Sequence, residues 1–539
     1  MSNLSTEEEI DRAFSSKGLL SDVVVGYKSR VEQSEMAQAI GAAIKKKEPI
    51  ICEAGTGTGK TFAYLIPAFY YGRKIIIATG TKTLQDQLYD QDIQVVRDAL
   101  KIPITVAKLK GRANYLCHQQ IERTKSERSF SSLREVEIFN MYERMLESSD
   151  SGDISEVNMP EENQRVQSSV VSTRDSCLGS DCPHINKCFV LKARKRALAA
   201  EVVVVNHHLF FADLALKQDG FGELLPECDV VIFDEAHQIG DVATQFFGSS
   251  ISTNQLNELL RDLRYGSVIM GDSTEAVDEL IDSFEKGIRN LRLSFEGLKG
   301  RYDLRERDKF SKAVEASSSL ATTSGELAES IRAIELINLE LQRCRERLLE
   351  AVVFLETWSK LGEHSVIRWF ESSVQSVRMH LTPIDVAEEF RSIVMNGERS
   401  WVFTSATLSV SGDASYFTQQ LGLEDALFRS WDSPFDYSQN SVLYVPNDMP
   451  EPSHASYVER VVNESIEAIC VARGRCMMLF TSLAAMRMAG EQLSKNLKDR
   501  NMEIPLLIQG DGSKFELLNQ FKKIKNAVLL GSHSFWEGV

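Results

Sequence analysis

The sequence predicts an α/β fold in which parallel sheets carry helices on both faces. Short apolar runs at 48–55, 74–79, 202–206, 230–234 and 401–405 are separated by stretches of helix-forming residues. This alternation is typical of parallel strands that are buried on both faces. A second series of runs, at 475–480, 504–508 and 527–531, predicts another sheet late in the 539-residue chain. Two α/β lobes are therefore expected, and the length allows three or four domains.

A phosphate-binding loop follows the first of these strands. Residues 53–61 read Glu-Ala-Gly-Thr-Gly-Thr-Gly-Lys-Thr and lead into good helix formers, which is the context that such a loop requires. Its glycines let backbone N–H groups converge on phosphate oxygens. Lys60 is expected to reach the β- and γ-phosphates of ATP, and Thr61 to place its hydroxyl on Mg²⁺. The expected nucleotide-binding residues of the loop are Ala54, Gly55, Thr56, Gly57, Thr58, Gly59, Lys60 and Thr61. The two lobes are then expected to be recA-like.

An acidic box, Asp234-Glu235-Ala236-His237, ends a later strand. Asp234 is placed to hold Mg²⁺ through the water shell of the metal. Glu235 is placed to orient and deprotonate the water that attacks the γ-phosphate.

Four cysteines lie between the phosphate loop and the acidic box: Cys117, Cys177, Cys182 and Cys188. The last three share one short loop, with gaps of 4 and 5 residues, and the first comes from far away in the sequence. Structural zinc also takes four thiolates, but zinc sites generally use Cys-x-x-Cys pairs, which this sequence lacks. The wider gaps favour an iron–sulfur cluster, whose ligands spread over the corners of a cube, and leave zinc as the alternative.

A long stretch of helix-forming residues follows the acidic box. No proline occurs between Glu227 and Thr382, and past Gln245 helix formers dominate. An all-helical insertion is therefore expected at about 246–362. Its apolar stripe is most simply the core of its own bundle, and a partner-binding face is the alternative.

Together, the cysteine quartet, the phosphate loop and the Asp-Glu-Ala-His box resemble the DinG and YoaA branch of XPD-like iron–sulfur helicases, over essentially the whole chain. The resemblance implies ATP, Mg²⁺ and a 4Fe–4S cluster held by the four cysteines. It also implies six segments: first lobe 1–110, iron–sulfur domain 111–192, first lobe 193–245, helical arch 246–362, first lobe 363–412, and an incomplete second lobe 413–539.

The same resemblance assigns roles to further residues. Arg30 and Gln33 correspond to the element that reads adenine, although an ordinary surface glutamine is the alternative. His237 couples the nucleotide site to the second lobe or is merely hydrogen-bonded; it completes an expected catalytic set of Lys60, Asp234, Glu235 and His237. The expected DNA contacts are Thr79, Thr81, Gln87, Ser405, Thr407 and Trp536.

The implied activity is that of an ATP-dependent 5′→3′ helicase on single-stranded and forked DNA, in repair or replication-fork rescue. A clamp-loader subunit or a single-strand-binding protein is the implied protein partner. The sequence stops at Val539, before the arginine-bearing last helicase motif, which indicates either a fragment or a natural truncation. A non-catalytic, nucleotide-gated scaffold on single-stranded DNA is therefore the alternative function.

The composition of the chain argues against several other classes of protein. A formal net charge of -16 argues against a uniformly basic nucleic-acid binder, although basic clusters occur at 45–47, 108–112 and 192–196. Nine cysteines are too sparse for a secreted disulfide scaffold. The chain shows neither a signal peptide nor a membrane-spanning apolar stretch, so a cytoplasmic location with reduced thiols is expected.

Overall fold

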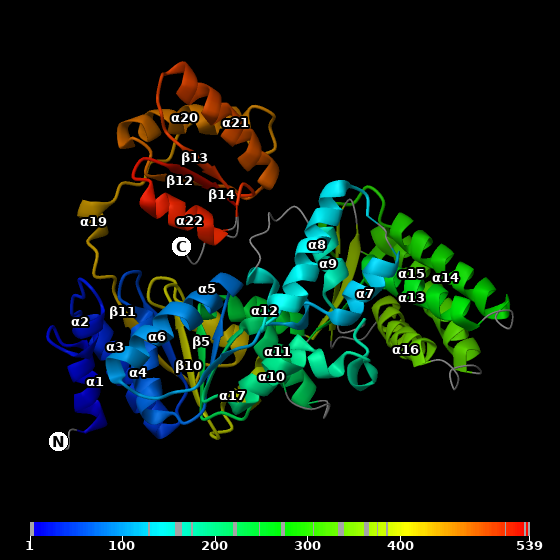
Figure 1. The fold of residues 1–539 in the computed structure, drawn as a ribbon, viewed down its shortest axis with the longest axis horizontal. Coiled ribbons are helices and arrows are strands. Elements are labelled where there is room, and N and C mark those ends of the chain that lie inside the picture. Colours follow the sequence, from blue (N-terminus) through cyan, green and yellow to red (C-terminus); the bar gives the residue numbers. More distant parts are fainter. Residues whose placement is uncertain are drawn as a thin grey trace.

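The structure of the protein is a computed structural model, in which two α/β lobes and two insertions are distinguished (Figure 1). It describes residues 5–127, 130–156, 164–173, 176–218, 224–246, 248–270, 275–304, 307–332, 339–360, 366–373, 376–383, 386–512, 514–532 and 535–536.

The first lobe is built on a seven-stranded parallel sheet in the order β11-β1-β10-β5-β2-β4-β3. The strands predicted in this lobe are confirmed to within two residues. Two strands were not predicted, β3 and β11. The bounds are β1 Ile50–Ala54, β2 Ile75–Thr79, β3 Val106–Lys108, β4 Val202–Asn206, β5 Val230–Asp234, β10 Ser400–Ser405 and β11 Leu427–Trp431.

Helices cover both faces of this sheet. Alternate residues of a strand point to opposite faces, so each buried strand contributes side chains to two cores. Ile75 and Ile77 of β2 pack into one core, while Ile76 and Ala78 pack into the other. The first core is closed by α1 Thr6–Phe14, α3 Val31–Lys46, α4 Lys60–Tyr71 and α6 Ile93–Leu100. The second is closed by α11 His207–Gln218, α12 Ile239–Phe246, α17 Val386–Val394 and α18 Ser415–Leu421.

The second lobe holds a three-stranded parallel sheet in the order β12-β14-β13. The strands predicted at 475–480, 504–508 and 527–531 are confirmed as β12 Cys476–Leu479, β13 Leu506–Ile508 and β14 Val528–Gly531. They pack with α20 Tyr457–Ala472, α21 Leu483–Asp499 and α22 Lys514–Lys523. The short helix α19 Tyr437–Asn440 lies in the segment that joins the two lobes (Figure 1).

The arch insertion is not all-helical, and that prediction is wrong. Its four long helices, α13 Thr253–Met270, α14 Glu275–Leu293, α15 Arg307–Arg332 and α16 Leu339–Ser359, pack against a four-stranded antiparallel sheet. Its strands are β6 Ser249–Ser252, β7 Gly300–Asp303, β8 Val366–Ser372 and β9 Val377–Pro383. β6 and β7 span only 4 residues each and are mostly polar. A run that short carries too little periodicity to be told from a helix terminus or loop.

Two segment boundaries also differ from the expected ones. β8 and β9 pair with the arch strands, although residues 363–412 were expected to belong to the first lobe. β11 pairs with β1 in the first lobe, although 413–539 was expected to be the second. Strand pairing is a tertiary contact. Local composition could therefore not show that β8 and β9 pair within the arch insertion or that β11 pairs within the first lobe.

The cysteine-bearing insertion has a small core of its own. Tyr115, Phe139, Tyr142 and Phe189 are among its buried residues. The helices that supply it are α7 His118–Glu127, α8 Leu133–Ser148, α9 Gln164–Val170 and α10 Phe189–Ala199. Among the described residues of the whole chain, every helix is too short or too polar to cross a membrane.

Lys110 joins this insertion to the first lobe through a buried ion-pair network. Its Nζ lies 2.9 Å from Asp86 Oδ1, 2.9 Å from Asp153 Oδ2 and 2.9 Å from Ser155 Oγ. Asp86 belongs to α5 (Lys82–Gln87), whereas Asp153 and Ser155 belong to the insertion. Burial alone would raise the pKa of Asp153, but the charge of Lys110 and its hydrogen bond outweigh burial and hold that pKa below its usual value.

Replacing Lys110 by Met should therefore lower stability by about 3 kcal/mol, because the Asp153 carboxylate would stay buried without its cation. Urea denaturation followed by circular dichroism measures the change. Lys45→Met is the matched control, since Lys45 forms only an exposed ion pair with Glu7, worth about 0–1 kcal/mol. Equal losses in the two variants would contradict the structural role of Lys110.

Candidate active site

The phosphate loop lies between β1 and α4. Gly57 and Gly59 both have φ of 86°, a conformation that residues with a Cβ adopt at a cost. Lys60 begins α4, and its Nζ donates to the carbonyl oxygen of Ala54 at 3.1 Å. The Thr58 hydroxyl donates to the carbonyl oxygen of Gly55 at 2.6 Å. The loop is thus folded back on itself at the N-terminus of a helix, where backbone N–H groups favour anions.

Arg30 and Gln33 hold the far side of this loop. Gln33 is 2% exposed, and its Nε2 donates to the Gly59 carbonyl oxygen at 2.9 Å. Its Oε1 accepts from the Tyr27 hydroxyl at 3.0 Å, and Arg30 donates to the Gly57 carbonyl oxygen. Gln33 is therefore not an ordinary surface glutamine. A role in reading adenine stays a prediction.

The acidic box lies at the carboxyl end of β5. Asp234 is buried, and burial, with the neighbouring Glu235 charge adding to it, raises its pKa to about 7, while Lys60 opposes the shift. Glu235 has a positive φ of 54°, a backbone conformation that non-glycine residues hold at functional sites more often than elsewhere. A raised carboxylate pKa beside a lysine is the kind of perturbation found where charged ligands bind.

His237 connects this box to the end of β10. Its Nδ1 lies 2.9 Å from Ser405 Oγ and 3.5 Å from Glu235 Oε2. Ser405 precedes a turn that is tied to the phosphate-loop strand, because Glu53 Oε1 accepts from the Ser409 hydroxyl at 2.7 Å. The other oxygen of Glu53 accepts from the backbone N–H groups of Leu408 and Ser409. The expected elements at 53–61, 234–237 and 404–408 are thus hydrogen-bonded into one site.

The six expected DNA contacts differ in their exposure. The side chains of Thr79 and Ser405 are fully buried. Thr81 caps α5 by accepting from the Leu84 N–H at 3.2 Å, and Gln87 and Thr407 are exposed. Trp536 is 54% exposed, and its Nε1 donates to the Phe480 carbonyl oxygen at 3.4 Å. All six stay predictions as DNA contacts. In this conformation neither Thr79 nor Ser405 is accessible to a strand.

The four cysteines are gathered in one region of the insertion. Cys117 donates its N–H to the Val170 carbonyl oxygen at 2.9 Å, just before α7, while Cys188 caps α10. The ring of His118 stacks on that of His184 at 5.7 Å, which brings the start of α7 against the loop of the other three cysteines. Burial raises the pKa of the Cys117 thiol, and Cys177 is close enough to add to that shift.

The thiol geometry bears on which metal group these residues fit. Within the described residues, no three His, Cys, Asp or Glu side chains are grouped around a point that could hold a single ion. Structural zinc needs its ligands at about 2.0–2.3 Å from one centre, whereas a 4Fe–4S cube holds thiolates apart at its corners. All four thiols are free and half-buried. Four thiols are the donors that a 4Fe–4S cluster takes, and such a cluster stays a prediction for this insertion.

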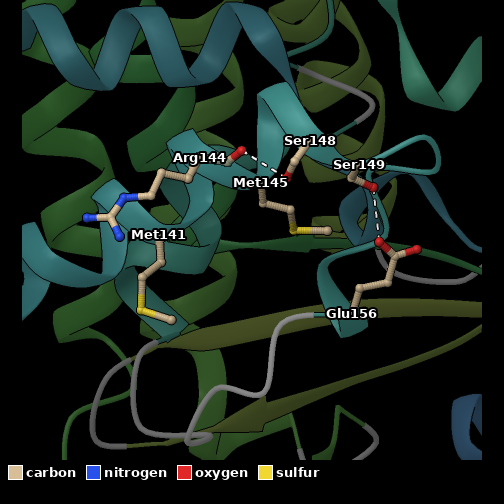
Figure 2. Close-up of a pocket in the computed structure, with 6 residues that line it drawn as sticks. All are labelled: Met141, Arg144, Met145, Ser148, Ser149 and Glu156. Atoms are coloured by element: carbon tan, nitrogen blue, oxygen red, sulfur yellow. Dashed lines mark hydrogen bonds between the residues drawn. The ribbon is translucent and has the colours of Figure 1, made fainter.

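A shallow pocket beside α8 lies in the same insertion (Figure 2). Its lining mixes methionine and polar side chains from Met141 to Glu156. Ser149 Oγ donates to Glu156 Oε2 at 3.0 Å, and Ser148 Oγ donates to the Arg144 carbonyl oxygen at 3.1 Å. The residues that line this pocket, within 141–156, lie outside the predicted active site.

Residues that the sequence did not single out also lie at the phosphate loop. Ser433, Phe435 and Tyr437 contact Thr56 and Gly57 from the segment that joins the lobes. Such a contact spans more than 370 positions, and the local pattern of 433–437 gives no sign of it. Glu53 was predicted to open the phosphate loop and was given no role of its own, yet its carboxylate anchors the turn after β10.

Comparisons with known proteins agree with this arrangement. Residues 33–158 match the DEAD/DEAH box helicase family, and residues 466–539 match the helicase C-terminal domain family. The ATP-dependent DNA helicase YoaA of Haemophilus influenzae is 37% identical over 534 residues, which cover 99% of this chain and 83% of that protein. YoaA of Escherichia coli is 39% identical over 533 residues, covering 98% and 82%. The ATP-dependent helicase DinG of Mycobacterium tuberculosis is 29% identical over 556 residues, covering 96% and 80%. The chain therefore belongs to the family of ATP-dependent DNA helicases that contains YoaA and DinG.

Proposed function

We propose that this chain is an ATP-dependent DNA helicase that moves 5′→3′ on single strands and carries an iron–sulfur cluster. The observation that carries the proposal is the hydrogen bond of 2.9 Å between His237 and Ser405. It joins the residues expected to hydrolyse ATP to an element expected to act on DNA. Identity of 37–39% to proteins named ATP-dependent DNA helicase supports the activity. Direction and cluster rest on the family resemblance and on the cysteine quartet.

In the proposed reaction the protein binds and orients ATP while water attacks the γ-phosphate, the bond from the γ-phosphorus to the bridging oxygen breaks, and ADP leaves with the electron pair of that bond. Backbone N–H groups of the loop and Lys60 bind the phosphates, and Lys60 neutralises charge as it develops. Glu235 accepts the proton of the attacking water. Thr61 and Asp234 would hold Mg²⁺, which would neutralise the charge of the phosphates.

His237 is proposed to transmit the state of this site. Its Nδ1 is hydrogen-bonded to Ser405 Oγ, and Glu235 Oε2 lies 3.5 Å from the same nitrogen. A change in the charge around Glu235 therefore alters the hydrogen bond that fixes Ser405. Because Glu53 holds the following turn, the exposed Thr407 would move with it.

The proposed substrates are single-stranded and forked DNA, in repair or replication-fork rescue. By family resemblance, a clamp-loader subunit or a single-strand-binding protein is the proposed partner, and the cytoplasm the proposed location. The basic clusters at 108–112 and 192–196 flank the cysteine quartet in sequence. Lys108 and Lys110 are engaged in ion pairs with Asp86, so the exposed residues of 192–196 supply the positive charge proposed for phosphate contacts, despite the acidic total charge.

DNA should stimulate ATP hydrolysis several-fold, and a duplex with a 5′ single-stranded tail should be unwound while one with a 3′ tail is not. A coupled phosphate-release assay and a fluorescent strand-displacement assay measure the two activities. Tight DNA binding without DNA-stimulated hydrolysis would favour the non-catalytic scaffold instead. Unwinding only from a 3′ tail would contradict the proposed direction.

Lys60→Ala should reduce hydrolysis by about 10²–10³-fold, because it removes a charged donor to the transferred phosphoryl group. Binding of a fluorescent single strand should stay within about twofold, since strand contacts are spread over many groups. Lys46→Ala, which changes an exposed lysine, is the control for both assays. Loss of DNA binding in a folded Lys60→Ala protein would show that the two sites are not separate.

Serine in place of Cys117, Cys177, Cys182 or Cys188 should remove the visible colour of anaerobically purified protein and its iron, because each thiolate holds one corner of the cluster. Unwinding should be lost, while ATP binding at Lys60 persists in its separately packed lobe. Iron and zinc analysis and the visible spectrum measure the outcome, with Cys470→Ser as a control outside the quartet. Near-stoichiometric zinc without iron in the unchanged protein would contradict the cluster assignment.

A further inference from the structure

The segment that leaves the first lobe runs directly over the phosphate loop. β11 ends at Trp431, whose carbonyl oxygen accepts from the Gly55 N–H at 3.1 Å. Ser433 then lies on the loop so closely that a Cβ at Gly55 would be 2.6 Å from the Ser433 nitrogen. After Tyr437 the chain continues through α19 toward the second lobe (Figure 1). The first residues of the joining segment are therefore part of the wall of the loop.

Hydroxyl groups fix this contact. Ser433 Oγ donates to the Thr56 carbonyl oxygen at 2.7 Å and lies 3.1 Å from the Tyr437 hydroxyl. The Tyr437 hydroxyl is in turn hydrogen-bonded to Thr56 Oγ1. Hydrogen bonds from Ser433 and Thr56 lower the pKa of Tyr437, and the Lys60 charge is close enough to contribute. The phenol hydroxyl thus lies on the phosphate loop at Thr56.

Phe435 covers the loop at Gly57. A Cβ at Gly57 would lie 2.1 Å from Phe435 Cε2, so the aromatic ring rests against the glycine backbone. Phe435 and Tyr437 are each 50% exposed, so part of each side chain is accessible beside the loop. A hydroxyl donor beside the phosphate loop is suited to the oxygens of a ligand with a polyphosphate chain.

We propose that Tyr437 binds ATP by donating its hydroxyl to a phosphate oxygen, while Phe435 closes the loop side of the same pocket. This inference rests on the proposed use of ATP and adds residues from the interlobe segment to that site. On ATP binding the Tyr437 hydroxyl exchanges Thr56 Oγ1 for a phosphate oxygen, which is the stronger, charged acceptor. Because Tyr437 begins α19, the exchange would couple phosphate occupancy to the path leading to the second lobe.

Tyr437→Phe tests the donor, because it removes only the hydroxyl and keeps the ring. Loss of one hydrogen bond to a charged phosphate should weaken binding of a fluorescent ATP analogue about tenfold. In steady-state hydrolysis, the KM for ATP should rise by a similar factor while kcat stays within about twofold, since Lys60 and Glu235 are unchanged. A merely structural role in shaping the loop would lower kcat as well, and that result would overturn the proposal.

Tyr444→Phe is the matched control. Its hydroxyl lies in the same interlobe segment but bonds to Glu464 Oε2 at 3.0 Å, away from the loop. If the Tyr437→Phe protein binds the ATP analogue as tightly as the Tyr444→Phe protein does, or more tightly than the unchanged protein, direct donation from Tyr437 to phosphate is refuted. Lys60→Ala is measured alongside: if it binds the analogue as well as the unchanged protein does, the phosphate-loop assignment itself fails. If Lys60→Ala weakens binding of the analogue and Tyr437→Phe does not, only the proposed role of Tyr437 is contradicted.

Discussion

Parallel pairing of three neighbouring strands is the constraint on which the site depends. In the register of the sheet, Glu53 of β1 lies opposite Ser405 of β10, and Thr404 of β10 lies opposite Asp234 of β5. Parallel strands end at the same edge of a sheet, so the phosphate loop, the acidic box and the turn after β10 emerge side by side. The bond between His237 and Ser405 is possible only in this register. A shift of one residue would turn Ser405 toward the other face.

The same constraint explains what the sequence could predict. Strands such as β5, which is buried at every position, carry continuous apolar runs that identify them without tertiary information. The phosphate loop is likewise local, because its glycines and Lys60 lie within a few residues of one another in the sequence. By contrast, β11 is only partly buried along its length and is defined by its pairing with β1. The contact of Tyr437 with Thr56 joins residues far apart in the chain, so no window of sequence could contain it.

The two insertions are tied to each other as well as to the first lobe. Arg343 of α16 donates to the Cys177 carbonyl oxygen at 3.4 Å and pairs with Asp181 at 3.4 Å. Asp262 of α13 accepts from Arg347 at 2.7 Å and pairs with Arg123 of the cysteine-bearing insertion at 3.6 Å. Each of these ion pairs is partly exposed, so each adds little to stability by itself. These ion pairs act mainly on orientation, because guanidinium groups fix the direction of their acceptors. They thereby hold the cysteine loop against the helical arch.

Two buried carboxylates show how electrostatics separates a structural group from a functional one. For Asp153, Lys110 lies at 2.9 Å and its charge and hydrogen bond outweigh burial, so the pKa falls below its usual value. For Asp234, burial outweighs the nearby Lys60, and the pKa rises to about 7. Side chains of the protein therefore balance the negative charge of Asp153, whereas they balance that of Asp234 only in part. A buried carboxylate in that condition gains stability from an added cation, and Asp234 stands at the strand end where the proposed Mg²⁺ would supply one.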